Sequence, residues 1–242
     1  MSKCEQCIVR QLNSLKELSK EELLRVSNCK TSKLIKKGEA LFEEGDHLNG
    51  VFCIQEGVCK ISKMSGNGRN QIIGLIQKGS LLGERSLLSE EASNLKAIAL
   101  NDMQVCFIPK DEIMRDLQRN NGFSMDVLKT MADTLKEADN LIVDMAQKTI
   151  KQRLAETLLY LNANFFSSEK GCIELSLSRK DYADIIGAAL ESTIRLLTDF
   201  KKKGIIAFIG KHILVLNMRE LEKIASGFEN NQLNQSIKEN RS

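Results

Sequence analysis

Short apolar segments separated by glycine occupy the first half of the chain. Nine of the fifteen glycines fall from Gly38 to Gly83. Apolar residues cluster among them in three runs, 51–54, 58–61 and 71–76. Runs of this length bounded by glycine are typical of β-strands joined by turns, so the pattern predicts a β-roll or small barrel.

The limits of this sheet follow from its turn residues. Gly66 and Gly68 flank one asparagine, which is typical of a hairpin turn. A last apolar run, 103–108, stops at Pro109, the only proline in the chain. Proline has no backbone N–H to give to a neighbouring strand, so the sheet is expected to close there.

Beyond Gly122 the pattern changes to that of a long helix over residues 123–145, with no glycine or proline inside it. Its apolar positions step by three and four, as in a coiled-coil seam. The seam consists of Leu128, Met131, Leu135, Ala138, Ile142 and Met145. A seam this narrow can pack on the β-domain or pair with the same helix of a second copy.

The stretch 177–204 has the spacing of two short helices joined by a tight turn. Ser178 can cap the first helix, with Asp181 reaching back to it, and Gly187 supplies the turn. Ala183 is small enough to let the two helix axes approach closely. The sequence therefore predicts a helix-turn-helix, preceded by an amphipathic helix that starts near residue 152 and opens a C-terminal domain.

Residues at the start of the second helix carry chemistry suited to DNA. Glu191 and Arg195 are four residues apart and so share a helix face beside Ser192. A carboxylate can accept from cytosine, and a guanidinium can bond both major-groove acceptors of guanine. A solvent-exposed ion pair is the plainer alternative. The further candidate DNA contacts are Arg179, Leu190, Lys201, Lys202, Lys203 and Lys211.

A small β-hairpin, or wing, is expected after the helix-turn-helix, because two apolar runs flank a Gly-Lys turn within 205–216. Helix-turn-helix proteins usually read two half-sites about one DNA turn apart, which favours pairing of the long helix in a homodimer. The alternative from another class is a sensory module whose winged helix binds a protein rather than DNA.

Composition limits these hypotheses without deciding them. The chain of 242 residues suggests two modest domains, and its net charge of +3 gives no bulk electrostatic case for nucleic-acid binding. With no apolar run long enough for a bilayer and no secretion signal, we expect a cytoplasmic protein without membrane contact. Its seven cysteines then suggest thiols, a metal site or redox sensing rather than disulfides.

Enzymatic function is not expected. The two histidines, His47 in a predicted turn and His212 in the wing, lie near no nucleophile motif. The chain also lacks a P-loop and a dinucleotide fingerprint. Cys172 is expected in a loop ahead of the helix-turn-helix.

Three segments resemble the family of the cyclic AMP receptor protein and the fumarate and nitrate reduction regulator (Crp/Fnr). Residues 34–46 are similar to its opening strands, 83–88 to its phosphate-binding cassette and 190–195 to its recognition helix. The resemblance implies an α+β fold with an N-terminal β-roll, a long dimerisation helix and a C-terminal winged helix-turn-helix. It implies a dimeric transcription regulator that binds a palindromic operator and RNA polymerase, with Glu191 and Arg195 contacting bases.

The expected domain limits follow from these patterns. They are a cysteine-containing helical segment at 1–30, the β-roll at 31–110, the dimerisation helix region at 111–147, the DNA-binding domain at 148–226 and a polar, disordered tail at 227–242.

The cassette argues against cyclic AMP as the effector. The effector-pocket candidates are Gly83, Glu84, Arg85 and Ser86. In the cyclic AMP receptors an Arg-Ser pair follows about ten residues later, whereas Asn94 and Leu95 stand here. Neither can neutralise a phosphate, so we expect a redox or oxygen-related signal instead.

The cysteines resemble those of the Fnr-like branch, whose iron–sulfur cluster is held by four cysteines. Cys4 and Cys7 form a CxxC pair, and Cys106 falls in the segment that supplies the distant ligand. Asn13 replaces the remaining cysteine, and an amide is not a thiolate ligand. Cys29 is the nearest substitute, with Cys53 and Cys59 as further options. A zinc site, a thiol switch and no cofactor remain alternatives.

Overall fold

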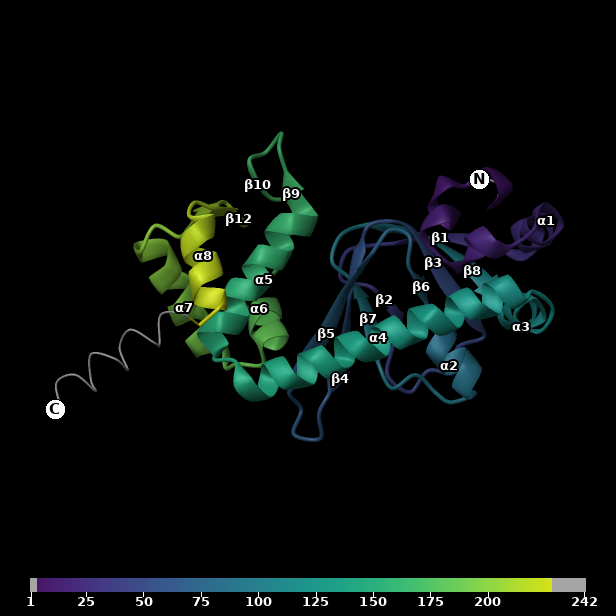
Figure 1. Cartoon of the computed structure of the whole chain (residues 1–242), viewed down its shortest axis with the longest axis horizontal. Coiled ribbons are helices and arrows are strands. Elements are labelled where there is room, and N and C mark those ends of the chain that lie inside the picture. The colour runs from purple at the N-terminus through teal and green to yellow at the C-terminus, as the bar shows by residue number, and fades with distance from the viewer. Residues whose placement is uncertain (1–3, 228–242) are drawn as a thin grey trace. The chain divides into compact units, whose positions relative to one another are not determined.

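The computed structural model describes residues 4–227, and the expected tail at 227–242 lies outside this range apart from Gly227. The chain divides into two compact units, Met1–Asp139 and Asn140–Ser242. The division falls within one long helix, α4 (Figure 1). No helix in the described part of the chain is both long and apolar enough to cross a bilayer.

Short helical turns precede the β-strands in the first unit. They are η1 (Cys4–Gln6), η2 (Ile8–Leu12), η3 (Ser14–Glu17) and α1 (Lys20–Cys29). Helix α1 begins at Lys20 because the Ser19 side chain accepts from the N–H of Glu22, whose carboxylate accepts from the N–H of Ser19 at 2.7 Å. Arg25 of α1 pairs with the Glu112 and Asp116 carboxylates, which fixes this segment to α3 (Lys110–Arg119).

Two four-stranded antiparallel sheets face each other in the first unit. One has the order β1-β8-β3-β6 and the other β2-β7-β4-β5. The strand bounds are β1 (Thr31–Ile35), β2 (Ala40–Phe42), β3 (Gly50–Glu56), β4 (Val58–Met64), β5 (Asn70–Gln77), β6 (Leu81–Leu82), β7 (Lys96–Ala99) and β8 (Met103–Pro109). Phe52, Ile61 and Ala97 are among the side chains of both sheets that share one core, so the β-roll expectation is confirmed.

Strand β3 is buried on both of its faces. Successive side chains of a strand point to opposite sides. Phe52 and Ile54 therefore enter the core between the sheets, whereas Val51 and Cys53 enter a second core formed with the N-terminal turns, α3 and α4. The N-terminal segment thus covers the outer face of one sheet.

The expected helix region at 111–147 consists of two helices, α3 (Lys110–Arg119) and α4 (Asn121–Gln147). The chain turns at Asn120, whose backbone is extended and whose side chain accepts from the N–H of Phe123 at 3.0 Å. Helix α4 therefore begins two residues before the sequence pattern predicts. Phe123, Val127 and Met131 pack into the second core.

A stripe of apolar side chains on α4 faces solvent. Leu128, Leu135 and Ile142 are 57%, 64% and 67% exposed, one heptad apart. Ala138 is also exposed, while Met131 and Met145 are partly buried. Most of the predicted seam is thus uncovered in a single chain.

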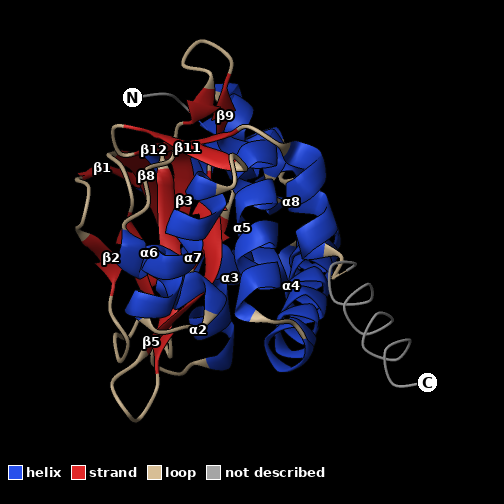
Figure 2. Cartoon of the chain, turned by 90° about the vertical axis from the view of Figure 1, so that its left-hand side faces the viewer, coloured by secondary structure: helices blue, strands red, loops and turns tan. Residues whose placement is uncertain are grey.

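The second unit contains helices around a small antiparallel sheet of order β11-β12-β10-β9. Its elements are α5 (Ile150–Phe165), β9 (Phe166–Ser167), β10 (Cys172–Ile173), α6 (Arg179–Ile186), α7 (Leu190–Lys202), β11 (Ile206–Ile209), β12 (His212–Val215) and α8 (Met218–Ala225). Helix α8 lies alongside α5 (Figure 2). Cys172, expected in a loop, instead lies buried in β10, which pairs with β9 and β12.

Arg153 of α5 joins the end of α4 to α6. Its Nη1 donates to the carbonyl oxygens of Met145 at 2.8 Å and Lys148 at 3.0 Å. Its Nε donates to the carbonyl oxygen of Ile186 at 2.8 Å. A guanidinium offers five N–H donors in a fixed plane and can satisfy carbonyls left unpaired at two helix ends at once.

Candidate functional site

The helix-turn-helix forms for the local reasons the sequence predicts. The Ser178 side chain accepts from the N–H of Asp181, and the Asp181 carboxylate accepts from the N–H of Ser178 at 2.8 Å. Gly187 ends α6 with φ 61°, in the left-handed region where a β-carbon is disfavoured. The chain then enters α7 at Leu190.

Helix α7 is amphipathic, and its buried side fixes its orientation. Thr193, Leu197 and Phe200 are buried. The opposite face exposes Glu191 and Arg195, and Leu190 and Ile194 beside them are 45% and 43% exposed. Leu190, one of the candidate DNA contacts, is therefore accessible to solvent. A rigid helix thus presents an acid and a guanidinium one turn apart.

The lysines predicted to contact phosphates lie at the end of α7 and in the turn of the wing. Lys201, Lys202, Lys203 and Lys211 are exposed. Lys203 pairs with Asp199 at 3.0 Å. The β11–β12 hairpin turns at Gly210, as expected from the Gly-Lys pair.

The Arg179 side chain packs on an aromatic ring rather than extending freely into solvent. Its guanidinium carbon lies 4.2 Å from the centroid of the Phe208 ring, and Lys201 Nζ lies 5.7 Å from the same centroid. The wing residue Phe208, which was not among the candidate residues, thus contacts one cation from α6 and one from α7.

The cassette residues surround the start of α2 (Glu84–Ser89). Gly83 has φ 102°, Arg85 is exposed and the Ser86 hydroxyl donates to the carbonyl oxygen of Glu91. Glu84 lines a small apolar cavity with Phe123 and Val127. Although its surface is only partly covered, burial of the carboxyl group raises the Glu84 pKa. A carboxyl group at this position offers no positive charge to a phosphate.

Asn94 and Lys96 occupy the region where a phosphate-binding pair would be needed. Asn94 is exposed, and its carbonyl accepts from Lys63 Nζ at 3.1 Å. Lys96 pairs with Glu43 at 2.7 Å. The cation nearest in sequence is therefore already neutralised by a carboxylate.

Four thiols gather at one cavity in the second core. The lining residues are Cys4, Cys7, Arg10, Leu15, Lys30, Cys53, Gln55, Cys106 and Ile108. The structure brings three of the predicted ligands together here but not Cys29, which is exposed with its Sγ 3.8 Å from Glu112 Oε1. Cys59 lies in the other core.

Burial and a neighbouring cation act in opposite directions on the thiols of the cavity. Burial raises the pKa of the Cys4 thiol, although the neighbouring Lys30 ammonium acts in the opposite direction. Burial lowers the pKa of Lys30, but attraction to Cys4 and Cys106 outweighs it and the pKa is raised. Lys30 therefore stays cationic and can stabilise thiolates.

The arrangement of these thiols distinguishes between the two metal chemistries that they could serve. Among residues 4–227, no three His, Cys, Asp or Glu side chains converge on a point where one metal ion could bind. Zinc held at about 2.3 Å by each sulfur needs such convergence. An iron–sulfur cluster takes its thiolates on separate irons, so four thiols spread around a cavity wall fit it.

Comparison with known proteins agrees with both units. Residues 32–120 match the cyclic nucleotide-binding domain model, and residues 152–224 match the Crp-like helix-turn-helix domain model. The Fumarate and nitrate reduction regulatory protein of Vibrio cholerae is 29% identical over 92% of this chain and 90% of its own. The Transcriptional activator protein anr of Pseudomonas aeruginosa is 27% identical over 93% of each.

Solved structures share the fold. A transcriptional regulator of the crp/fnr family from Eubacterium rectale superposes with a TM-score of 0.74 at 17% identity, covering 88% of this chain and 97% of that one. FixK2 from Bradyrhizobium japonicum gives 0.72 at 23% identity, covering 81% and 96%.

A cyclic nucleotide-binding fold followed by a winged helix-turn-helix defines a class of DNA-binding transcription regulators. The chain belongs to the Crp/Fnr family, on the side of the fumarate and nitrate reduction regulators. The expected family and fold class are both confirmed.

Two residues at these sites escaped the sequence prediction, and a third was named there only as a further option. Phe208 carries no motif, and Lys30 is one of many lysines. Cys53 was only one of several options. The signal that selects it is strand pairing, since the register between β3 and β8 sets Cys53 opposite Cys106.

Proposed function

We propose that the chain is a homodimeric, sequence-specific transcription regulator that responds to a redox or oxygen-related signal through its N-terminal thiols rather than to cyclic AMP. The observation that carries the proposal is the outward placement of Glu191 and Arg195 on a helix whose opposite face is buried. RNA polymerase and a palindromic operator are the partners that this role requires.

Base reading is supported by the rigidity of the helix that carries the pair. The α6–α7 turn is closed by Gly187, and Tyr182 and Leu197 are almost fully buried. A fixed helix can insert its first turns in the major groove with Glu191 and Arg195 towards base edges. Exposed lysines near the wing would meet phosphates, which position the protein without reading sequence.

Dimerisation is supported by the uncovered stripe on α4. Leu128, Leu135 and Ile142 are each more than half exposed and repeat every seven residues. Exposed apolar residues in a heptad pattern are stabilised when a second helix covers them. Two copies joined in this way would present two recognition helices to the two halves of a palindrome.

A route for the signal is supported by bonds between the N-terminal segment and the start of α4. Lys16 pairs with Asp126 at 2.9 Å. The Asn120 amide donates to the carbonyl oxygen of Glu17 and to the Glu22 carboxylate, both at 3.0 Å. A change at the thiols that moves this segment would therefore act directly on the dimerisation helix.

The test is DNA binding by the full chain with duplexes selected from genomic fragments. Arg195→Ala and Glu191→Ala should each lose about 1–3 kcal/mol of discrimination at one base pair. Lys202→Ala should weaken all sequences alike and reduce the salt dependence by about one phosphate contact. Titration with cyclic AMP should show no saturable binding.

Equal losses on specific and random DNA for Arg195→Ala would contradict base reading. Failure of the wild-type chain to shift any duplex would favour a winged helix that binds protein instead.

A further inference from the structure

One face of the sheet formed by β3 and β8 carries two thiols side by side. Cys53 and Cys106 are directly paired across the antiparallel strands. Opposed residues have neighbouring β-carbons and point to the same side of the sheet. Both are buried, at 2% and 4% exposure, and both face the N-terminal segment.

The N-terminal segment brings its own two thiols to the same place. The backbone turn of η1 closes with the Cys7 N–H donating to the Cys4 carbonyl at 3.2 Å. Cys7 Sγ lies 3.1 Å from Gln55 Oε1, one side chain along the strand face from Cys53. Two short, independent elements therefore each supply a pair of sulfurs to one cavity.

The Asn13 side chain links the N-terminal turns to the sheet that carries Cys53. Its amide nitrogen lies 3.5 Å from Cys53 Sγ and donates to the Gly79 carbonyl oxygen at 2.9 Å. Its side-chain oxygen caps η3 by accepting from the N–H of Leu15. The position that lacks a thiol in the N-terminal segment is thus in contact with a thiol of the sheet.

Side-chain amides partly offset the effect of burial on Cys53, which raises the pKa of this thiol to about 12. The Gln55 amide lies 3.4 Å from its Sγ, so two N–H donors approach the same sulfur. Lys30 and Arg10 line the cavity, and two cations reduce the cost of gathering several thiolates. Hydrogen bonds to ligand sulfurs are also a means by which proteins tune such sites.

We propose that Cys53, together with Cys4, Cys7 and Cys106, holds an iron–sulfur cluster in this cavity, and that Cys29 lies outside the ligand set. The inference rests on the proposed redox signal, for which it names the site. The CxxC turn supplies two ligands, and the β3–β8 pair supplies two more on a rigid sheet. Four protein sulfurs complete the coordination that such a cluster needs without a ligand from Asn13.

The experiment uses the full chain, purified without oxygen and reconstituted with ferrous iron and sulfide. The measurements are visible absorbance and the iron and acid-labile sulfide bound per chain. The wild type, Cys29→Ser and Cys59→Ser should carry the same cluster, whereas Cys53→Ser should lose the absorbance and most of the iron and sulfide. Because Cys53 is buried, Cys53→Ala is measured beside it, and circular dichroism checks that both variants fold.

A rescue variant separates ligand loss from structural damage. Asn13→Cys in the Cys53→Ala background should restore iron, sulfide and absorbance, because residue 13 contacts the sulfur that was removed. A folded Cys53→Ala that retains full iron and sulfide overturns the proposal, as does loss of the cluster from Cys29→Ser.

The proposal of a DNA-binding regulator and the proposal of a cluster can be overturned by different results. A wild-type chain that stays colourless, or that binds one zinc ion instead, overturns the cluster. If that same preparation still binds a palindromic duplex, and Arg195→Ala loses its specificity, the role as a DNA-binding regulator stands.

Discussion

Arg179 lies over the ring of Phe208, with 4.2 Å between the guanidinium carbon and the ring centroid. This contact joins the first turn of α6 to wing strand β11. The two elements are separated in sequence by the whole of α7. A stacked guanidinium keeps its edge N–H groups available while its face is held.

Phe208→Leu should release Arg179 and weaken DNA binding of all sequences to a similar degree. The lost cation–π contact is worth about 0.5–1 kcal/mol at a partly exposed site. Binding to specific and random duplexes by fluorescence anisotropy measures the effect, and Phe208→Tyr, which keeps an aromatic face, serves as the control. A change in sequence preference would show that Phe208 also orients the residues proposed to read bases.

Gly50→Ala should destabilise the first unit. A β-carbon there would overlap the carbonyl oxygen of Ile108 on strand β8. Overpacking of this kind costs about 1–3 kcal/mol. Gly66→Ala is the control, because nothing lies within 4 Å of the added carbon. Thermal unfolding followed by circular dichroism should show a lower Tm for the first variant alone.

The cysteines outside the thiol cavity should differ strongly in reactivity. Burial raises the pKa of Cys59 to about 12, so at pH 8 this thiol is protonated as well as covered. Cys29 is exposed. Since the thiolate is the reactive form, iodoacetamide should modify Cys29 first and Cys59 only in denaturant. Mass spectrometry of peptides after timed quenching gives the order, and modification of native Cys59 at the rate of Cys29 would contradict it.

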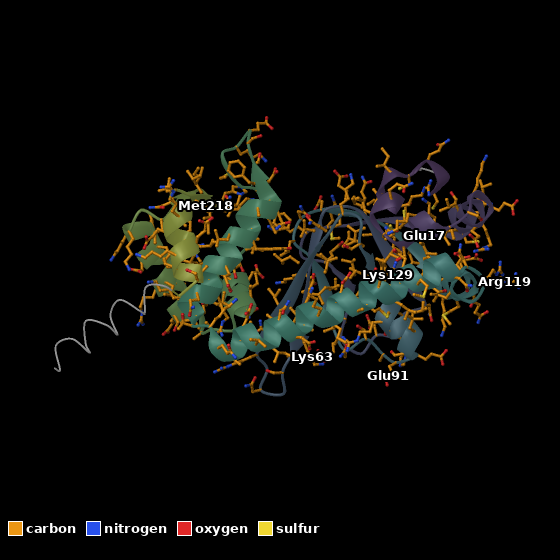
Figure 3. The ribbon with its side chains drawn as sticks, in the orientation of Figure 1. Glu17, Lys63, Glu91, Arg119, Lys129 and Met218 are labelled. Atoms are coloured by element: carbon orange, nitrogen blue, oxygen red, sulfur yellow. The ribbon has the colours of Figure 1, made fainter. Side chains whose placement is uncertain are left out.

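Leu135→Glu should shift the protein towards monomers. The side chain is 64% exposed in the single chain, and a carboxylate in a dimer seam would lose its hydration without gaining a partner. Lys129→Glu introduces the same group at an exposed position of α4 outside the stripe and should leave the mass unchanged. Lys129 is labelled in Figure 3. Sedimentation equilibrium distinguishes the two. Equal masses for both variants would argue against pairing through this stripe.

Local chemistry made several elements predictable from sequence. The Ser178 cap needs only Asp181, three positions later, and the Gly187 turn is closed by a bond to Ala183, four positions earlier. Both form as expected. The hairpin at Gly66 and Gly68 is likewise local, with the Ser65 N–H donating to the Arg69 carbonyl oxygen. Such features need no knowledge of the remaining fold.

Other features depend on contacts between distant segments. Strand β3 is buried on both faces, so its apolar run does not alternate and does not reveal which side Cys53 takes. The break at Asn120 was missed because it needs a side-chain cap rather than a glycine or proline. The placement of Cys29 near Glu112 depends on how α1 docks on α3, which periodicity alone does not describe.

The hydrogen bonds of Arg153 have a mechanical consequence. Its guanidinium donates to the carbonyl oxygens of Met145 near the end of α4 and of Lys148 just after it, and to that of Ile186 just before the Gly187 turn. Because one guanidinium holds both segments, we expect a displacement at the end of α4 to move the turn that precedes α7. Movement of α4 would then reach the helix-turn-helix directly, without an intervening structural element.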